Sequence, residues 1–529
     1  MPEQRRFVAR RTVLAAGAAG LGAVGAAALA GPLPGAALAQ PPSRRLGDPF
    51  TLGVASGDPS PDGAVLWTRL APQPLADDGM GGMPARPYQV EWELADDDGF
   101  RRIERRGTAD AFPASAHAVH VELGGLRPGR EYFYRFRVDG HLSPVGHTRT
   151  APPPAALGGP LTMCFASCSQ FEHGFFTAYR RLAEEEPDVV LHLGDYQYEH
   201  TANDYVAPGG NVRDHAGPET VTLANYRQRH AQYKTDPDLQ AAHAVAPWLV
   251  VWDDHELDNN WAGEIPESFQ PDFLARRAAA LRAYYENMPL RRSSVPSGID
   301  LLLYRRVAWG RMATFHMLDT RQYRDDQPCG DEFNSDCAQR TDPERSITGA
   351  EQEVWLLDGL RRSTSRWDVL GQQVFFSQVD FTPGPARGFN PDAWDGYVGN
   401  RDRIVAGLRD PAVRNAVVLT GDVHAHWAAE VRERFDDPSS PSVGTELVAT
   451  SITSGGDGSE TRPDTATTLA ENPHIRFYNN RRGYVRTRFT TSEMRADFRV
   501  VPYVSEPGAP AQTRASFVVP DREPRLNWA

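Results

Sequence analysis

The chain has no excess of basic residues, no internal repeat and few cysteines. Its 69 acidic residues outnumber its 56 lysines and arginines, which gives a formal net charge of -13. A protein that binds DNA or RNA usually carries a basic surface, so this balance does not indicate a nucleic-acid-binding regulator. Hydrophobic residues make up 40% of the chain and charged residues 24%. That composition excludes a disordered polymer and is typical of a globular protein.

The length predicts more than one domain. A chain of 529 residues is too long for one compact core, and we expect two or three domains with ample buried surface. The acidic balance is compatible with cation sites. It does not establish them, because surface carboxylates usually keep a protein soluble.

Residues 1–39 have the features of a Tat signal peptide. Arg10 and Arg11 precede an apolar stretch that runs to about Ala30, and Ala37-Leu-Ala39 has the small-x-small form of a signal-peptidase site. The alternative is a membrane anchor, but the Gly and Pro residues at the end of the segment and the cleavage site favour export. We predict a periplasmic or extracellular protein that the Tat machinery exports, with no stable membrane span after cleavage.

Residues 45–152 show the period-two alternation of β-strands. Tyr88-Gln-Val-Glu-Trp-Glu-Leu94 alternates apolar and polar residues, and turns such as Arg127-Pro-Gly129 separate such runs. The pattern predicts a small all-β sandwich domain. The stretch from 126 to 132 is similar to a corner of a fibronectin-type domain. Residues 151–160, rich in Pro, Ala and Gly, are expected to be a linker.

From residue 160 to residue 529 the pattern changes to alternating strands and helices, which predicts an α/β catalytic domain. Thr348-Gly-Ala-Glu351 has the sequence of a capping box at the start of one helix. The stretches 484–489 and 498–501 alternate and are expected to be antiparallel strands at a sheet edge. Helical patterns are also found at 175–182 and 273–285, and buried strands are predicted at 161–165, 189–193, 248–252, 312–318, 369–370 and 417–419.

Side chains able to bind metal follow these strands in turn. In open α/β sheets, ligands bind outside the carboxyl ends of the strands, so the clusters indicate one convergent site. Any one cluster alone is equally well explained as a cap, a turn or a core histidine. The clusters are Cys168; Asp195 and Tyr198; Asp253, Asp254, His255 and Glu256; Asp319 and Arg321; and Asp422, His424 and His426.

Several motifs together are specific to one family. They are Phe165-Ala-Ser-Cys168, Gly194-Asp-Tyr-Gln-Tyr-Glu199, Trp252-Asp-Asp-His-Glu256 with Asn259-Asn-Trp-Ala262, Leu318-Asp-Thr-Arg-Gln-Tyr-Arg324, Ala393-Trp-Asp-Gly-Tyr397, Gly421-Asp-Val-His424 and Thr450-Ser-Ile-Thr-Ser-Gly-Gly456. From about residue 45 onward the chain resembles the alkaline phosphatase D family, the PhoD-type metallophosphoesterases. The resemblance implies an αββα metallophosphoesterase-like sandwich behind the β-domain, a site built from Fe(III) and Ca²⁺, and hydrolysis of phosphoric esters. The wider superfamily has Asp-x-His in its first block and Asn where Asp254 stands, so its residue roles do not transfer there.

The donor set agrees with a trivalent ion. Cys168, Asp195, Tyr198 and His424 offer thiolate, carboxylate, phenolate and imidazole. This set is softer than a calcium cage and richer in anionic donors than a structural zinc site. Because a trivalent ion balances those negative charges, we predict that these residues hold Fe(III).

A second, harder ion is expected beside the first. Asp195 has two oxygens and can bridge the two ions. Asp422, with Asp254 or Asn260, would complete an oxygen-rich site of the kind that Ca²⁺ prefers. His255 is predicted to be a site residue that either donates a proton or supports a ligand.

These ions would generate a metal-bound oxygen nucleophile near neutral pH, so no serine nucleophile is required. The fork of Arg321 can take two phosphate oxygens and stabilise the transition state. The alternative is a surface arginine paired with Asp319 or Asp325. Trp394 and Tyr397 stand on a Pro/Gly-rich loop and are predicted to contact substrate, although aromatic loop residues more often pack.

The cysteines divide into two pairs by context. Cys329 and Cys337 lie eight residues apart in a loop rich in Gly, Asp and Asn, where an exported protein favours a disulfide. Cys164 falls within a strand and is expected to be an inert buried thiol.

Two classes of function therefore compete. The first is a secreted metal-dependent phosphomonoesterase or phosphodiesterase of the alkaline phosphatase D type, with a phospholipase D-like phosphodiesterase as its variant. The second is a non-catalytic, calcium-stabilised surface protein. The second explains carboxylates but gives no reason for Cys168, Tyr198 and Arg321 together.

Overall fold

The computed structural model describes residues 46–331, 333 and 337–529. The predicted export segment lies outside the described residues. Within the part of the chain that is described, no helix is both long and apolar enough to cross a membrane. Leu46–Ala529 forms one compact unit.

The elements alternate as the sequence predicts from residue 160 onward. The helices are α1 Thr177–Ala183, α2 Leu223–Lys234, α3 Pro237–Val245, α4 Phe273–Asn287, α5 Gly349–Arg361, α6 Val398–Leu408 and α7 Thr465–Glu471. The strands are β1 Val54–Ser60, β2 Gly63–Arg69, β3 Tyr88–Ala95, β4 Ile103–Ala111, β5 Ala118–Glu122, β6 Glu131–Val138, β7 His141–Leu142, β8 Gly146–Arg149, β9 Leu161–Ala166, β10 Val189–Leu193, β11 Pro247–Val251, β12 Arg305–Trp309, β13 Ala313–Met317, β14 Trp367–Gly371, β15 Ala416–Thr420, β16 His426–Arg432, β17 Ser442–Val448, β18 Gly458–Ser459, β19 Ile475–Phe489, β20 Glu493–Val501, β21 Gln512–Pro520 and β22 Asn527–Trp528.

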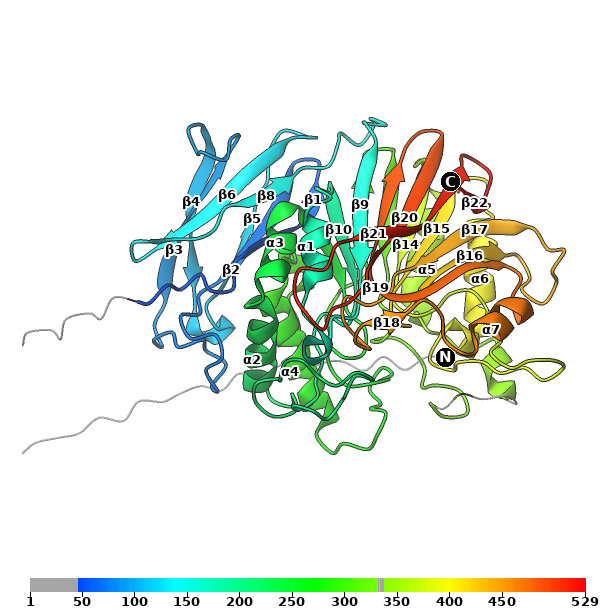
Figure 1. The fold of residues 1–529 in the computed structure, drawn as a ribbon. Coiled ribbons are helices and arrows are strands. Elements are labelled where there is room, and N and C mark those ends of the chain that lie inside the picture. Colours follow the sequence, from blue (N-terminus) through cyan, green and yellow to red (C-terminus); the bar gives the residue numbers. More distant parts are fainter. Residues whose placement is uncertain (1–45, 332, 334–336) are drawn as a thin grey trace, which may run out of the picture. The chain divides into compact units, whose positions relative to one another are not determined.

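Two β-sheets pack against each other and share one long strand. The first sheet runs β5-β2-β1-β11-β10-β9-β19-β20-β21-β22, and the second runs β12-β13-β14-β15-β17-β16-β19. β19 pairs with β16 through residues 475–479 and with β9 and β20 through residues 482–489. The prediction that residues 484–489 lie at a sheet edge is therefore wrong, because β19 lies between β9 and β20 and joins the two sheets (Figure 1).

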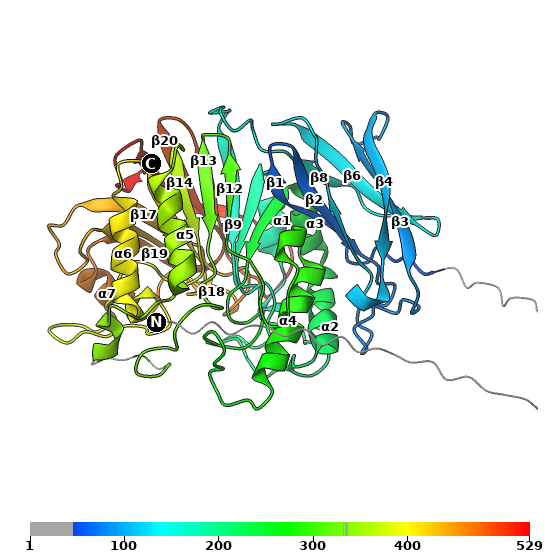
Figure 2. The ribbon, with the colours of Figure 1, turned by 180° about the vertical axis from the view of Figure 1, so that it is seen from behind.

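One apolar core fills the space between the sheets. Leu193 of β10 and Met317 of β13 are fully buried in it. Gly371, at the end of β14, leaves room for both, because a Cβ there would lie 2.9 Å from the Met317 sulfur and 3.5 Å from Leu193 Cδ2. Helices α1 and α3 contact strands of the first sheet, and α6 contacts β17 of the second. Figure 2 shows α5 and α6 beside the second sheet. The layers follow the predicted αββα order.

The N-terminal β-rich region is joined to the first sheet. β1 pairs in parallel with β11, with Ser56 opposite Pro247. β3, β4, β6, β7 and β8 form a separate sheet, and a second apolar cluster that includes Leu66 and Phe136 fills the space between this sheet and β1, β2 and β5. The predicted linker also packs against the second sheet, since Arg311 N donates to Ala156 O at 2.7 Å. The β-sandwich is thus continuous with the α/β layers.

The predicted capping box at Thr348 is not formed. Thr348 is the N-cap of α5, but its side chain makes no bond to the first turn. Its hydroxyl donates instead to Asn400 Oδ1 at 3.1 Å. A tertiary contact with α6 has replaced the local cap.

Candidate metal centre

The predicted ligands lie at sharp turns just after the strands end. Five of the seven have left-handed backbones, which are uncommon for residues with a side chain. Such strained residues gather at functional sites, where the surrounding structure holds them in place. The φ angles are 60° at Cys168, 53° at Asp195, 49° at Asn260, 65° at Asp422 and 53° at His424.

The predicted Fe(III) ligands converge. A ligand atom from each of Cys168, Asp195 and His424 lies within 4.8 Å of the other two. The Tyr198 hydroxyl donates to Asp195 Oδ2 at 2.8 Å and lies 3.2 Å from His424 Nε2. Cys168, Asp195 and Tyr198 are buried, whereas His424 is partly exposed. Four unlike donors from three strand ends therefore surround one point.

Ser454 holds the phenol of Tyr198. Its hydroxyl lies 2.8 Å from the Tyr198 oxygen and 2.9 Å from Cys168 O. The loop that carries Ser454 follows β17, and Gln170 N donates to the same hydroxyl at 3.2 Å. Ser454 belongs to the motif Thr450–Gly456, but its type and position alone did not indicate a role for its hydroxyl.

A group of carboxylates adjoins this point. Asp195, Asp254 and His255 each place a possible ligand atom within 4.8 Å of the others. Asp254 Oδ1 accepts from His255 N at 3.0 Å, and Asp254 Oδ2 accepts from Asn260 N at 2.9 Å. The Asn260 side chain donates to Glu267 at 3.2 Å. Thus Asn260 reaches Asp254 through its backbone.

The acidic groups in this cluster have strongly shifted pKa values. Burial, together with Asp195, raises the pKa values of the Cys168 thiol and the Tyr198 phenol well above their ordinary values. Burial, with Asp253 next, raises the pKa of Asp422 well above its usual value. Burial would also raise the pKa of Asp254, but Arg321 and His255 outweigh it and lower that pKa. Without a cation, the cluster disfavours several of its own negative charges.

The residues fit a cation. Asp195 Oδ1 and Asp253 Oδ2 are buried and make no hydrogen bond within the described residues. A buried carboxylate oxygen without a partner is costly, and a cation supplies the missing partner. Thiol, phenol, imidazole and carboxylate are the donors that a transition-metal ion takes. The adjoining carboxylates suit a harder ion.

His255 forms a buried pair with Glu199. Its Nδ1 lies 2.8 Å from Glu199 Oε2, and its ring stacks on Tyr198 with centroids 4.1 Å apart. Burial would lower the pKa of His255, but Glu199, Asp254 and Asp195 outweigh it and raise that pKa well above its ordinary value. Glu199 belongs to the motif Gly194–Glu199, yet sequence spacing does not indicate that it bonds and orients His255.

Arg321 is buried and its fork is already filled. Nη1 and Nη2 donate to the two oxygens of Asp392 at 2.8 Å each, and Nε donates to Asp253 at 2.6 Å. Arg324 and Gln327 also donate to Asp392. The prediction of a fork open to phosphate is therefore corrected, and so is the alternative of a surface pair with Asp319 or Asp325.

Trp394 and Tyr397 do not reach the surface. Both are fully buried among apolar side chains. The Trp394 indole donates to Gln372 Oε1 at 2.9 Å, and the Tyr397 hydroxyl donates to Asp325 O at 2.7 Å. Their burial contradicts the prediction that they contact substrate, and the packing alternative describes them correctly.

The cysteines lie in three different surroundings. Cys329 and Cys337 are bonded, with sulfurs 2.14 Å apart. Cys164 is a buried thiol within β9, and Cys168 is a buried thiol at the candidate metal centre.

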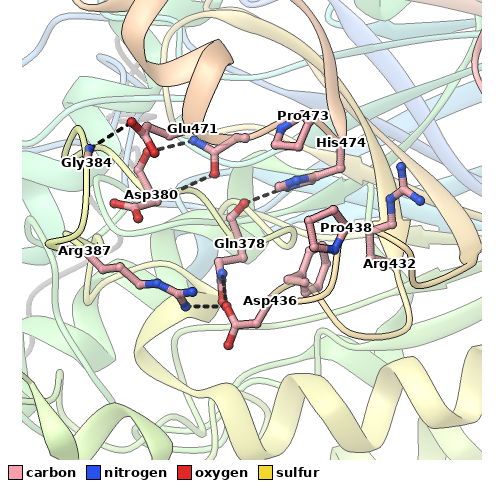
Figure 3. A pocket seen from close by; sticks show the side chains of 12 residues that line it. Gln378, Asp380, Gly384, Arg387, Arg432, Asp436, Pro438, Glu471, Pro473 and His474 are labelled. Carbon is pink, nitrogen blue, oxygen red and sulfur yellow. Dashed lines mark hydrogen bonds and ion pairs between the residues drawn. The ribbon is translucent and has the colours of Figure 1, made fainter.

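A separate pocket of about 260 Å³ contains none of the candidate ligands. Figure 3 shows it, with Arg387 paired to Asp436 and the His474 ring against Gln378. Its carboxylates are already bonded, Asp436 to Arg387 and Glu471 to Gly384 N. The convergent chemistry lies at the strand ends instead.

Comparison with known proteins agrees with this fold. Residues 163–498 match the family model for PhoD-like phosphatase, and residues 36–152 match the model for its N-terminal domain. Alkaline phosphatase D of Bacillus subtilis (strain 168) is 52% identical over 472 residues, which cover 89% of this chain and 80% of that protein. A solved structure described as "Structure of PhoD" superposes with a TM-score of 0.89 at 51% identity and covers 91% of this chain and 92% of its own.

The fold is that of a phosphatase with a β-rich N-terminal region and a layered α/β domain. The chain belongs to the PhoD-like phosphatase family and is a phosphoric ester hydrolase.

Proposed function

We propose that this protein is an exported, metal-dependent alkaline phosphatase of the PhoD type that hydrolyses phosphate monoesters and small diesters. The observation that carries the proposal is the convergence of Cys168, Asp195, Tyr198 and His424 at one point. The twin arginine of the N-terminal segment supports export by the Tat route to the periplasm or the exterior.

Fe(III) is the ion that best suits that donor set, and Ca²⁺ suits the carboxylates beside it. Cys168, Asp195, Tyr198 and His424 would hold the iron. Asp195, Asp254 and Asp422 would hold the calcium, with Asn260 as a further candidate. When bound, such ions polarise the phosphoryl group and neutralise the charge that develops in the transition state.

The chain's own residues supply orientation and a proton. Glu199 bonds to Nδ1 of His255, and a ring nitrogen of His255 lies within 4.8 Å of possible ligand atoms of Asp195 and Asp254. From there His255 can donate a proton to the departing alcohol oxygen. Arg321 neutralises Asp253 and Asp392 and holds them in place, so its contribution to the reaction is through the carboxylates.

A calcium-stabilised surface protein is a weaker explanation. Calcium prefers oxygen donors, and such a role leaves the buried Cys168 thiol and His424 unexplained. The family membership also favours catalysis.

The proposal is tested by Asp195→Asn, which removes a charge and keeps the shape. We expect hydrolysis of 4-nitrophenyl phosphate and bis(4-nitrophenyl) phosphate to be lost together with bound metal. Asp368→Asn is the matched control, because Asp368 of β14 is also fully buried but bonds His316 of β13 and Ser363. The control is expected to lose stability and keep both activities. Full activity in the Asp195 variant would refute the proposal.

A further inference from the structure

One buried side chain bonds to both loops that carry carboxylates of the candidate metal centre. Asp195 follows β10, and Asp253 follows the neighbouring parallel strand β11. Glu256 lies three residues after Asp253 in the same loop, and its side chain, only 1% exposed, reaches the loop after β10. Its Oε2 accepts from Asp195 N at 3.0 Å and from Asp253 N at 2.8 Å, and its Oε1 accepts from Tyr196 N at 2.6 Å.

Gly194, in the loop after β10, packs closely against Asp253 of the other loop. Gly194 has φ +106°, and a Cβ there would lie 2.4 Å from Asp253 Cβ and 2.6 Å from Asp253 N. Because real Cβ atoms do not approach so closely, the two loops can lie this near only without a side chain at residue 194. Gly194 and Glu256 are thus independent signs of one fixed loop-to-loop distance.

The sheet itself does not set that distance. The last paired residues of β10 and β11 are Leu193 and Val251. Asp195 and Asp253 lie beyond them, where no ladder bond joins the strands. Asp195 also has a left-handed backbone, which needs support from its surroundings. Glu256 supplies that support by accepting the N–H groups of Asp195 and Tyr196.

We propose that Glu256 is a positioning residue that fixes the separation of Asp195 and Asp254, so that one cation can contact both. The inference rests on the proposed function, because it concerns the same metal centre. Glu256 would touch neither the ion nor the substrate. It acts through the backbone of the two loops, in the way that groups surrounding a metal site orient its ligands.

The second half of the molecule contains a matched glutamate. Glu446 of β17 is buried and accepts from Phe376 N and Ser377 N at 2.8 Å each and from the Thr420 hydroxyl at 2.7 Å. It therefore makes the same kind of bonds to strand-end loops. None of its partners Phe376, Ser377 and Thr420 is a candidate ligand. A Glu446 variant therefore serves as a control for the general loss of stability.

The experiment compares Glu256→Gln with Glu446→Gln. Both amides present N–H groups to backbone donors, so both variants should unfold at lower temperature. We expect Glu256→Gln alone to weaken Ca²⁺ binding by about 10–100-fold, measured by calorimetry, to lower iron content, and to lower kcat on 4-nitrophenyl phosphate with little change in KM. Glu256→Asp should recover part of the Ca²⁺ affinity, because it restores an acceptor.

If Glu256→Gln does not fold, Gly194→Ala tests the same contact without altering the glutamate, and it should give the same loss of metal and kcat. Equal effects of the Glu256 and Glu446 variants on metal and kcat would overturn the inference and leave the proposed function standing. If Asp195→Asn keeps both metal and hydrolysis, the proposed function fails and the inference fails with it.

Discussion

The Arg321 guanidinium and the Asp392 carboxylate form a two-pronged ion pair, with Nη1–Oδ1 and Nη2–Oδ2 both at 2.8 Å. Both side chains are buried, and the Arg321 Nε bonds Asp253 as well. Arg321 thus compensates two carboxylates that stand beside the candidate ligands. Its substitution should be felt first in folding and in metal retention.

We predict that Arg321→Ala lowers the free energy of unfolding by about 3–5 kcal/mol, because it leaves buried carboxylates without their partner. Arg321→Lys should recover little, since an ammonium cannot form two parallel bonds. Chemical denaturation and metal analysis measure both effects. Arg401→Ala is the control, because Arg401 is a buried partner of Asp395 and should lose stability without losing metal. A stable Arg321→Ala variant whose only defect is a higher KM would contradict this account.

His255→Gln tests the proton donor. An alcohol with a high pKa needs a proton to leave, whereas 4-nitrophenolate hardly does. We expect kcat on an alkyl phosphate to fall by about 10²–10⁴-fold and kcat on 4-nitrophenyl phosphate to fall far less. His426→Gln is the comparison, since His426 is buried and accepts from Thr450 N. His426→Gln should change kcat on both substrates by a similar factor. An equal loss on both substrates in the His255 variant would argue against proton donation.

The cysteines should differ in reactivity. Cys329 and Cys337 should appear as one disulfide-linked peptide in a non-reducing digest. Cys168 should react slowly with iodoacetamide until a chelator removes the metal, because a bound ion would block the sulfur. Cys164 should stay unreactive in the folded protein, since burial raises its pKa well above the ordinary value and only a thiolate reacts readily. A disulfide between Cys168 and any other cysteine would exclude a role for Cys168 as a metal ligand.

His474 should make the protein sensitive to acid. Burial, with Arg432 and Arg401, lowers its pKa to about 4, although the bond to Gln378 O opposes the shift. The unfolded chain binds this proton near pH 6.5, so the unfolded state gains stability as pH falls from 6.5 toward 4. His474→Gln can still donate to Gln378 O and does not titrate. Its stability relative to the wild type should improve over that window, by up to about 3 kcal/mol at pH 4. A stability difference between His474→Gln and the wild type that does not change with pH would contradict the lowered pKa of His474.

The strand ends were predictable, and their detailed geometry was not. The run 189–193 stands out as apolar in sequence and is a strand with those bounds, because a strand buried on both faces needs no polar alternation. Helix α2 gave no such signal, since it buries polar residues such as Gln228 and His230. The partner of Arg321 lies 71 residues away in sequence, a distance at which local pattern carries no information. The same holds for the burial of Trp394, which depends on the packing of α6 and β14.

The positions of the ligands also needed the fold. Residue type and order suggested Cys168, Asp195 and His424, because each follows a predicted strand. Their left-handed backbones and the hydroxyl of Ser454 against Tyr198 follow only once distant loops are brought together. Glu256 is part of the motif Trp252–Glu256, but residue spacing does not predict its bonds to Asp195 N and Asp253 N.

Elemental analysis of the purified protein, taken with its visible spectrum, tests the central claim most directly. Phenolate or thiolate bound to Fe(III) absorbs visible light, so the active protein should be coloured and contain stoichiometric iron. Tyr198→Phe should shift or bleach the band, and Asp195→Ala should remove the metals. A colourless, fully active protein that contains zinc in place of iron would contradict the assigned centre.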